Sequence, residues 1–339
     1  MNPTILSVSP LSSPWKTQDP FLFCAHHRDA YPSGNGRYGP KEEALSRRNI
    51  GNDFSSTDGW SMYHGTKVPG FPAHPHRGFE TLTITTEGFV DHADSLGAAG
   101  RYGEGDVQWI TTGKGLQHSE MFPLLEEDKD NPLEIFQIWL NLPAKNKGVE
   151  PEFHMLWSEN IPHIKGITKE GAKTGIKVIT GTFGAISYPC KATHSWAANP
   201  ANEVVVCMIK MDPHAFVRLP TASVGTNRNL YFYHGDTIEL DGITIHANQR
   251  ITLDPTKKVL LQNGDKQARL MLLQGRPIGE PVAKYGPFVM NTQAEINTAI
   301  KDFRSTQFGG WPWQKPDQVH ENHLGRFARY PDGTEERPE

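Results

Sequence analysis

Four side chains in the first half of the chain are of types that bind transition metals, and they occur as two pairs with the same spacing. One residue separates His74 from His76, and one residue separates His118 from Glu120. If each pair lies in a β-strand, its two side chains point to the same face, because side chains alternate along a strand. Two neutral imidazoles that converge on one point are typical of transition-metal sites. Such pairs also occur on solvated polar strands, so neither pair alone identifies a site.

Together the two pairs make a mixed set of three imidazoles and one carboxylate. The chain between them is long enough for several antiparallel strands, which could bring the pairs side by side. The set suits Fe(II), Mn(II), Ni(II) or Cu(II), and it lacks the thiolates common in structural zinc sites. Four protein ligands leave open positions on an octahedral ion for water, substrate or dioxygen. The residues alone leave the choice of metal open.

Glu80 is a rival carboxylate, because a regular strand would point it the same way as His76, four residues earlier. It could bind the ion, orient a histidine ligand, or lie at the mouth of a barrel. A carboxylate next to a ligating histidine commonly orients that histidine. We therefore expect Glu80 to orient a histidine or to lie at the rim rather than to bind the ion.

The composition is that of a globular protein. The 339 residues favour two domains, and 34 basic against 38 acidic residues give a formal net charge of −4. Proteins that bind nucleic acid usually carry a basic excess, so we expect no direct contact with nucleic acid. Three cysteines without a Cys-x-x-Cys spacing favour a reducing compartment. The sequence shows neither a secretory signal nor a long apolar stretch, which predicts a cytoplasmic protein without membrane contact.

Short segments rich in β-branched and aromatic residues, separated by many glycines, predict an all-β fold of the barrel or sandwich type. A capping-box pattern at Thr292 and Glu295, followed by apolar residues at helical spacing, predicts a helix at 293–305. The expected organisation is a first domain at 1–145 with a surface insertion at 29–60, a linker and the first strands of the second domain at 146–175, a second domain at 176–310, and a tail at 311–339.

Five motifs, in order along the chain, resemble the signatures of the pirin family. They lie within roughly residues 20–310, and together they are far more specific than a single His-x-His pair. The motifs are HPHRGFET at 74–81, GDVQW at 105–109, HSEM at 118–121, QIWLNLP at 137–143, and GPFVMNT at 286–292 followed by IKDF at 300–303.

The resemblance implies two cupin (jelly-roll) β-barrel domains that face each other, with a short C-terminal helix and one divalent metal ion in the first barrel only. The family's three histidines and one glutamate map onto His74, His76, His118 and Glu120. Cupins in general use a glutamate shortly after the His-x-His pair, here Glu80, but pirins use the one after the third histidine. Fe(II) is the implied metal, with Mn, Ni, Cu and Zn as alternatives. The insertion at 29–60 looks longer than is typical of the family and would reshape the entrance to the metal.

The resemblance also implies two functions. Pirin-like proteins include quercetin 2,3-dioxygenases, which open the central ring of a flavonol with dioxygen. In such an enzyme the ion would bind the deprotonated 3-hydroxyl group and Glu120 would take its proton, which makes Glu120 the candidate catalytic residue. The alternative is a non-enzymatic regulator that binds a transcription factor or a metabolic enzyme, with the oxidation state of iron as the switch. We expect a monomeric dioxygenase that acts on a small aromatic, flavonol-like substrate.

Overall fold

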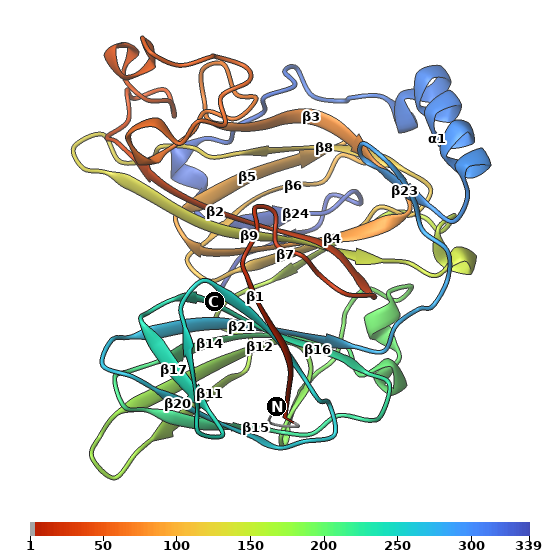
Figure 1. The fold of residues 1–339 in the computed structure, drawn as a ribbon. Coiled ribbons are helices and arrows are strands. Elements are labelled where there is room, and N and C mark those ends of the chain that lie inside the picture. The colour runs from red at the N-terminus through yellow and green to blue at the C-terminus, as the bar shows by residue number, and fades with distance from the viewer. Residues whose placement is uncertain (1–3) are drawn as a thin grey trace. The chain divides into compact units, whose positions relative to one another are not determined.

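The structure is a computed structural model that describes residues 4–339, so the first three residues of the expected domain 1–145 lie outside it. The chain is built mainly of β-strands, as predicted, and it divides into two compact units (Figure 1). The histidine unit contains Ala25–Glu159 and Glu280–Glu339, and the second unit contains residues 4–24 and Asn160–Gly279. Among the described residues, no helix has the length and apolar character needed to span a membrane.

Two antiparallel sheets form the histidine unit, and their inner faces share an apolar core. The core takes Ile110 and Ile135 from one sheet and Val90, Tyr102 and Leu116 from the other. The first sheet has the strand order β10 (Glu152–Leu156), β7 (Val107–Thr111), β4 (Phe79–Glu87), β9 (Asn131–Asn141) and β2 (Phe21–Tyr31). The second has the order β25 (Glu335–Glu336), β24 (Phe327–Arg329), β6 (Ala99–Gly103), β5 (Phe89–Asp94), β8 (Leu116–Met121) and β3 (Gly70–His76).

The second unit is also two-layered. Its larger sheet has the order β1 (Ile5–Pro10), β19 (Gln249–Leu253), β16 (Asn227–His234), β21 (Ala268–Gly275), β14 (Val205–Met211), β12 (Lys173–Phe183) and β11 (His163–Ile167), and β13 (Ile186–Tyr188) pairs with β12. Its smaller sheet has the order β15 (Phe216–Leu219), β20 (Val259–Asn263), β17 (Thr237–Leu240) and β18 (Ile243–His246). Aliphatic side chains such as Val178, Leu230 and Leu261 fill the space between these sheets.

The chain does not complete the two units in sequence order. Strand β1, near the start of the chain, pairs with β19 of the second unit. After the second unit the chain returns, adding the hairpin β22 (Ala283–Tyr285) and β23 (Phe288–Met290), the helix α1 and strand β24 to the histidine unit; β24 pairs with β6. The expected boundaries instead placed 293–305 in the second domain. Hydrophobic periodicity reports which face of an element is buried but does not say against which sheet, and this accounts for the difference.

The predicted helix is confirmed as α1, Gln293–Thr306. The Thr292 hydroxyl accepts a hydrogen bond from the backbone N–H of Glu295, and the Glu295 carboxylate accepts one from the backbone N–H of Thr292 at 2.8 Å, which completes a capping box. Ile296 and Ala299 are buried against Phe288 and Met290 of β23. The helix therefore packs on the hairpin that precedes it, as Figure 1 also shows.

The expected linker at 146–175 contains strands, and the expected tail at 311–339 is hydrogen-bonded to the histidine unit. Within the expected linker 146–175, β10 pairs with β7 of the histidine unit and β11 pairs with β12 of the second unit. Within the expected tail, the indole N–H of Trp313 donates to the backbone carbonyl of Asp94. The backbone N–H of Ala73 on β3 donates to the carbonyl of Pro316. The tail is thus attached to the same sheet that carries the histidines.

Candidate metal centre

The two candidate pairs lie on neighbouring antiparallel strands, β3 and β8. In this pairing His74 lies directly opposite His118, and Phe71 lies opposite Glu120. One ring nitrogen from each of His74, His76 and His118 lies within 4.8 Å of the other two. The structure thus brings together the three histidines that were selected from the sequence, because alternation along β3 and β8 sends them all to the inner face.

The protonation of these rings suits a cation. Burial lowers the pKa of His76 and His118, and the neighbouring imidazoles lower it further. Burial also lowers the pKa of His74, although the charge of Glu120 acts in the opposite direction. All three rings are therefore neutral near pH 7 and offer a lone pair.

Unpartnered nitrogens give a direct test of whether these residues fit a metal. Among residues 4–339, neither ring nitrogen of His76 or of His118 has a hydrogen-bond partner, although both side chains are buried. Such atoms cost about 1–3 kcal/mol each when they stay unsatisfied. The Nδ1 atom of His74 lies 2.9 Å from the carbonyl oxygen of Pro72, so this nitrogen carries the proton and Nε2 faces the cluster. The donor set therefore fits a divalent transition metal.

Glu120 lies at the edge of the cluster and is held from two other strands. One carboxylate oxygen, Oε2, is 3.8 Å from the Nε2 atom of His118. The amide of Gln137 on β9 donates to Oε2 at 2.6 Å, and the hydroxyl of Thr83 on β4 donates to Oε1 at 3.1 Å. Both oxygens thus have a fixed donor, which sets the orientation of the carboxylate beside the imidazoles.

We predict that Thr83→Val weakens metal binding by about tenfold, because it removes the hydrogen bond that orients Glu120. Loss of such a bond lowers metal affinity by about 10–100-fold in other proteins. Thr83→Ser keeps the hydroxyl and should bind within about twofold of the original protein. Thr85→Val is the matched control, since Thr85 lies two residues along β4 and its buried hydroxyl has no hydrogen-bond partner among residues 4–339. Competition with a chromophoric chelator for Ni(II) measures the affinities. Equal affinities of the Val and Ser variants would show that the hydroxyl does not position Glu120.

Glu80 does not face the histidine cluster. In the regular part of β4 it is an odd number of residues from Thr83, so the two side chains point to opposite faces. Its Oε1 atom accepts hydrogen bonds from the indole N–H of Trp109 and the hydroxyl of Thr111, and its side chain is buried. Both expected roles of Glu80, orienting a histidine ligand or lying at the rim, are therefore wrong, because the carboxylate lies on the face of its sheet that points away from the histidines.

Two further side chains to which the sequence assigned no role, His92 and Trp139, lie near the imidazoles. The ring of His92 on β5 is 5.7 Å from that of His118, measured between centroids, and it stacks on Phe153. The ring of Trp139 on β9 lies 5.4 Å from His76. Alternation along the motif QIWLNLP at 137–143 would have placed Gln137 and Trp139 on one face, but only the strand pairing shows that this face is the inner one.

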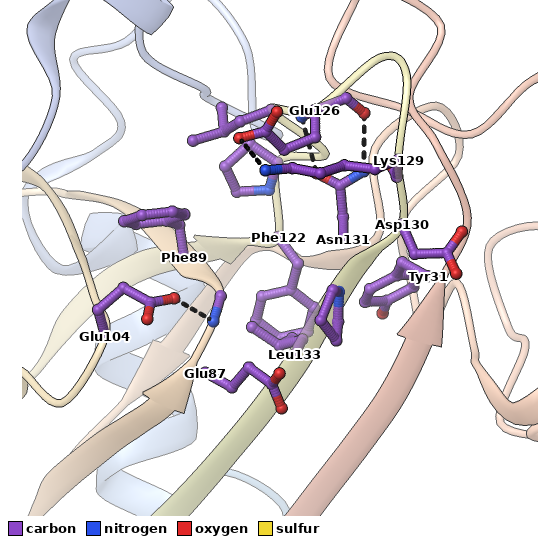
Figure 2. Close-up of a pocket in the computed structure, with 14 residues that line it drawn as sticks. Tyr31, Glu87, Phe89, Glu104, Phe122, Glu126, Lys129, Asp130, Asn131 and Leu133 are labelled. Carbon is purple, nitrogen blue, oxygen red and sulfur yellow. Dashed lines mark hydrogen bonds and ion pairs between the residues drawn. The ribbon is translucent and has the colours of Figure 1, made fainter.

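A separate cavity of about 210 Å³ lies in the histidine unit, where several strands end (Figure 2). Phe122 and Leu133 contribute apolar surface, and Glu87, Glu104 and Asp130 contribute carboxylates. The carboxylate of Glu104 accepts a hydrogen bond from the backbone of Gly88. None of the residues that line this cavity belongs to the histidine cluster.

Comparison with known proteins agrees with the architecture. Residues 14–140 match the family described as Pirin, and residues 206–309 match the Pirin C-terminal cupin domain. Human pirin is 35% identical over 275 residues, which cover 78% of this chain and 88% of that protein. A Pseudomonas aeruginosa protein, provisionally named a quercetin 2,3-dioxygenase, is 35% identical over 70% of this chain and 79% of its own length.

Among solved structures, a quercetin 2,3-dioxygenase from Acinetobacter baumannii has a similar fold. Its TM-score is 0.69 at 23% sequence identity, and the match covers 91% of this chain and 98% of that one. At this identity the likeness concerns the fold alone. Two domains match family models, and human pirin is 35% identical over 78% of this chain. The chain therefore belongs to the pirin family.

Proposed function

We propose that this protein is a mononuclear iron-dependent dioxygenase of the quercetin 2,3-dioxygenase type, with His74, His76, His118 and Glu120 as the ligands of Fe(II). The observation that carries the proposal is the cluster of three neutral imidazoles, in which neither ring nitrogen of buried His76 or buried His118 has a hydrogen-bond partner among residues 4–339. An oxygen- and nitrogen-based set without thiolates suits Fe(II). The name of the Pseudomonas relative supports the reaction class.

In this proposal the protein positions a flavonol and manages one proton. A bound ion would supply Lewis acidity toward the oxygen of the 3-hydroxyl group, which makes that group easier to deprotonate. Glu120 is the base that takes the proton, since its carboxylate lies beside the imidazoles. Each of its oxygens already accepts one hydrogen bond and keeps a second lone pair. Thr83 and Gln137 therefore hold the base in place without blocking it.

Oxygen consumption with quercetin tests the proposal. The protein is loaded with Fe(II) without oxygen, its metal content is measured, and uptake is then followed beside the His76→Ala variant. We expect uptake that matches the loss of flavonol and that disappears in the variant. A fully loaded protein that consumes no oxygen with any flavonol would contradict the dioxygenase, and the non-enzymatic regulator would become the better proposal.

A further inference from the structure

The insertion places an exposed aromatic ring close to the histidine cluster. Of the three histidines only His74 is partly exposed, so a ligand from solvent would reach the cluster past His74. The ring of Phe71, which is also partly exposed, lies 6.3 Å from that of His74. Phe54, which belongs to the insertion, lies 6.3 Å from Phe71. His64 lies beside both phenylalanines, at 5.1 Å from Phe54 and 5.8 Å from Phe71. A continuous row of rings therefore leads from the surface to His74.

Phe54 is not part of the core. Its side chain is 52% exposed, and the buried core cluster of the histidine unit does not include it. Edge contacts with the rings of Tyr63 and His64, at 5.5 and 5.1 Å between centroids, hold Phe54 in position, while about half of its surface stays in water. A single exposed ring is common, but rings that gather at the surface, as Phe54 does with His64 and Phe71, are typical of a surface that binds a ligand.

A buried ion pair keeps the loop that carries Phe54 in place. Arg48 and Asp53 form this pair at 2.9 Å, and both side chains are almost fully buried. Arg48 also donates to the carbonyl oxygens of Ala44, Thr57 and Trp60 and lies over the Trp60 ring. Burial alone would raise the pKa of Asp53, but hydrogen bonds from the Met62 backbone, Ser55 and Arg48 lower it to about 2. Asp53 therefore stays charged, and the residue after it has a fixed position.

Three residues near Asp53 have strained backbone conformations, which the hydrogen bonds of Asp53 and its neighbours stabilise. Ser56, Asp58 and Tyr63 adopt φ values of 51°, 54° and 56°, in the left-handed region that residues other than glycine seldom occupy. Two backbone hydrogen bonds of 2.8 Å join Asp53 to Tyr63, and the Tyr63 hydroxyl donates to buried Asp29. Strained residues that the surroundings hold in place are characteristic of segments with a function.

We propose that Phe54, with Phe71 and His64, forms a recognition surface for the flat ring of an aromatic substrate on its way to His74. The inference rests on the proposed function in that the substrate must reach the metal. Phe54 is then a residue that determines specificity, and it acts by offset or edge-to-face stacking. The ligand class is a planar phenolic molecule, because such a molecule has a flat ring that can stack on Phe54 and an oxygen that would suit a metal held by the histidines.

Binding of quercetin to Ni(II)-loaded protein without oxygen tests the inference apart from turnover. Phe54→Ala should raise the dissociation constant by about tenfold, the order expected when one stacked aromatic ring is lost. Phe54→Trp keeps a ring and should bind within about twofold of the original protein. Phe216→Ala is the matched control, since Phe216 is 47% exposed in the second unit. Quenching of tryptophan fluorescence gives the constants, and the nickel content of each variant is measured first.

The outcomes separate this inference from the proposed function. A loss of affinity in Phe54→Ala, with nickel content unchanged and Phe216→Ala unaffected, supports the recognition surface even if the Fe(II) protein consumes no oxygen. Equal affinity of Phe54→Ala and the original protein would overturn it even if the Fe(II) protein is an active dioxygenase. A fully loaded original protein that binds no flavonol would also overturn it.

Discussion

Removal of the His76 imidazole should abolish stoichiometric metal binding. His76→Ala deletes one of three converging nitrogen donors, and the affinity should fall by more than about 100-fold, since even a residue that only orients a ligand can contribute 10–100-fold. The apo protein should keep its fold, because His76 is not a member of the apolar core cluster and both of its ring nitrogens lack partners among residues 4–339. Metal content by inductively coupled plasma mass spectrometry and the far-UV circular dichroism spectrum measure the two effects.

Glu80→Gln is the matched control for this experiment. Glu80 is as buried as His76, but its carboxylate accepts from Trp109 and Thr111 on the outer face, and glutamine keeps an oxygen for these bonds. We expect a full complement of metal in this variant. Retention of the metal by His76→Ala, or its complete loss from Glu80→Gln, would contradict the assignment of the ligands.

The second large effect concerns the buried ion pair between Arg101 and Asp91. Two nitrogens of the guanidinium group contact the two carboxylate oxygens at 2.7 and 2.8 Å, and both side chains are almost completely buried. Arg101→Met leaves the Asp91 carboxylate buried without its cation, which should lower the free energy of unfolding by about 3–5 kcal/mol. Arg101 also donates to the carbonyl oxygen of His320, so this hydrogen bond to the tail is lost as well. Urea denaturation followed by intrinsic fluorescence measures the change.

Arg329→Met provides the comparison. Arg329 lies on the adjacent strand β24 and pairs with Glu335, but these side chains are 44% and 31% exposed. An exposed pair contributes about 0–1 kcal/mol because water screens it. If both arginine variants lost the same stability, burial would not be the cause of the strength of the Arg101 contact. The double variant Arg101→Met with Asp91→Leu should recover part of the loss, because it removes both charges together.

The sequence predicted the all-β class, the C-terminal helix and the convergence of His74, His76 and His118. The strand character, the helix and the shared face of His74 and His76 depend on local properties, namely alternation along a strand and a cap followed by apolar residues at helical spacing. The approach of His118 to this pair depends in addition on the pairing of β3 with β8. The same alternation failed for Glu80. Strand β3 ends at His76 and β4 begins at Phe79, and the Arg77–Gly78 step between them, with φ of 87° at Gly78, changes which face the following residues occupy. Counting residues across a turn therefore does not preserve the face.

Other features of the centre depend on contacts between distant parts of the chain. Thr83 and Gln137 reach Glu120 because β4 pairs with β9 and the two sheets pack face to face, and neither fact follows from residue spacing. The insertion at 29–60 was expected as a surface loop near the entrance. Its order comes from Arg48, whose partners are spread over several turns of the loop. The ligand role of the four residues and the monomeric state remain predictions.

The return of the chain to the histidine unit has a consequence for biosynthesis. On the ribosome the strands that carry the histidines emerge early, but β24 and the residues that bind Arg101 emerge only after the whole second unit. At about 5–20 residues per second, the delay between Glu120 and Phe327 is on the order of 10–40 seconds. During that time one edge of the sheet, along β6, lacks its neighbour. In a nascent chain the histidine unit can therefore add β24 to its sheet only after the second unit has been synthesised. Aggregation should be most sensitive to ribosome stalling between Glu120 and Phe327, while the edge of β6 is exposed.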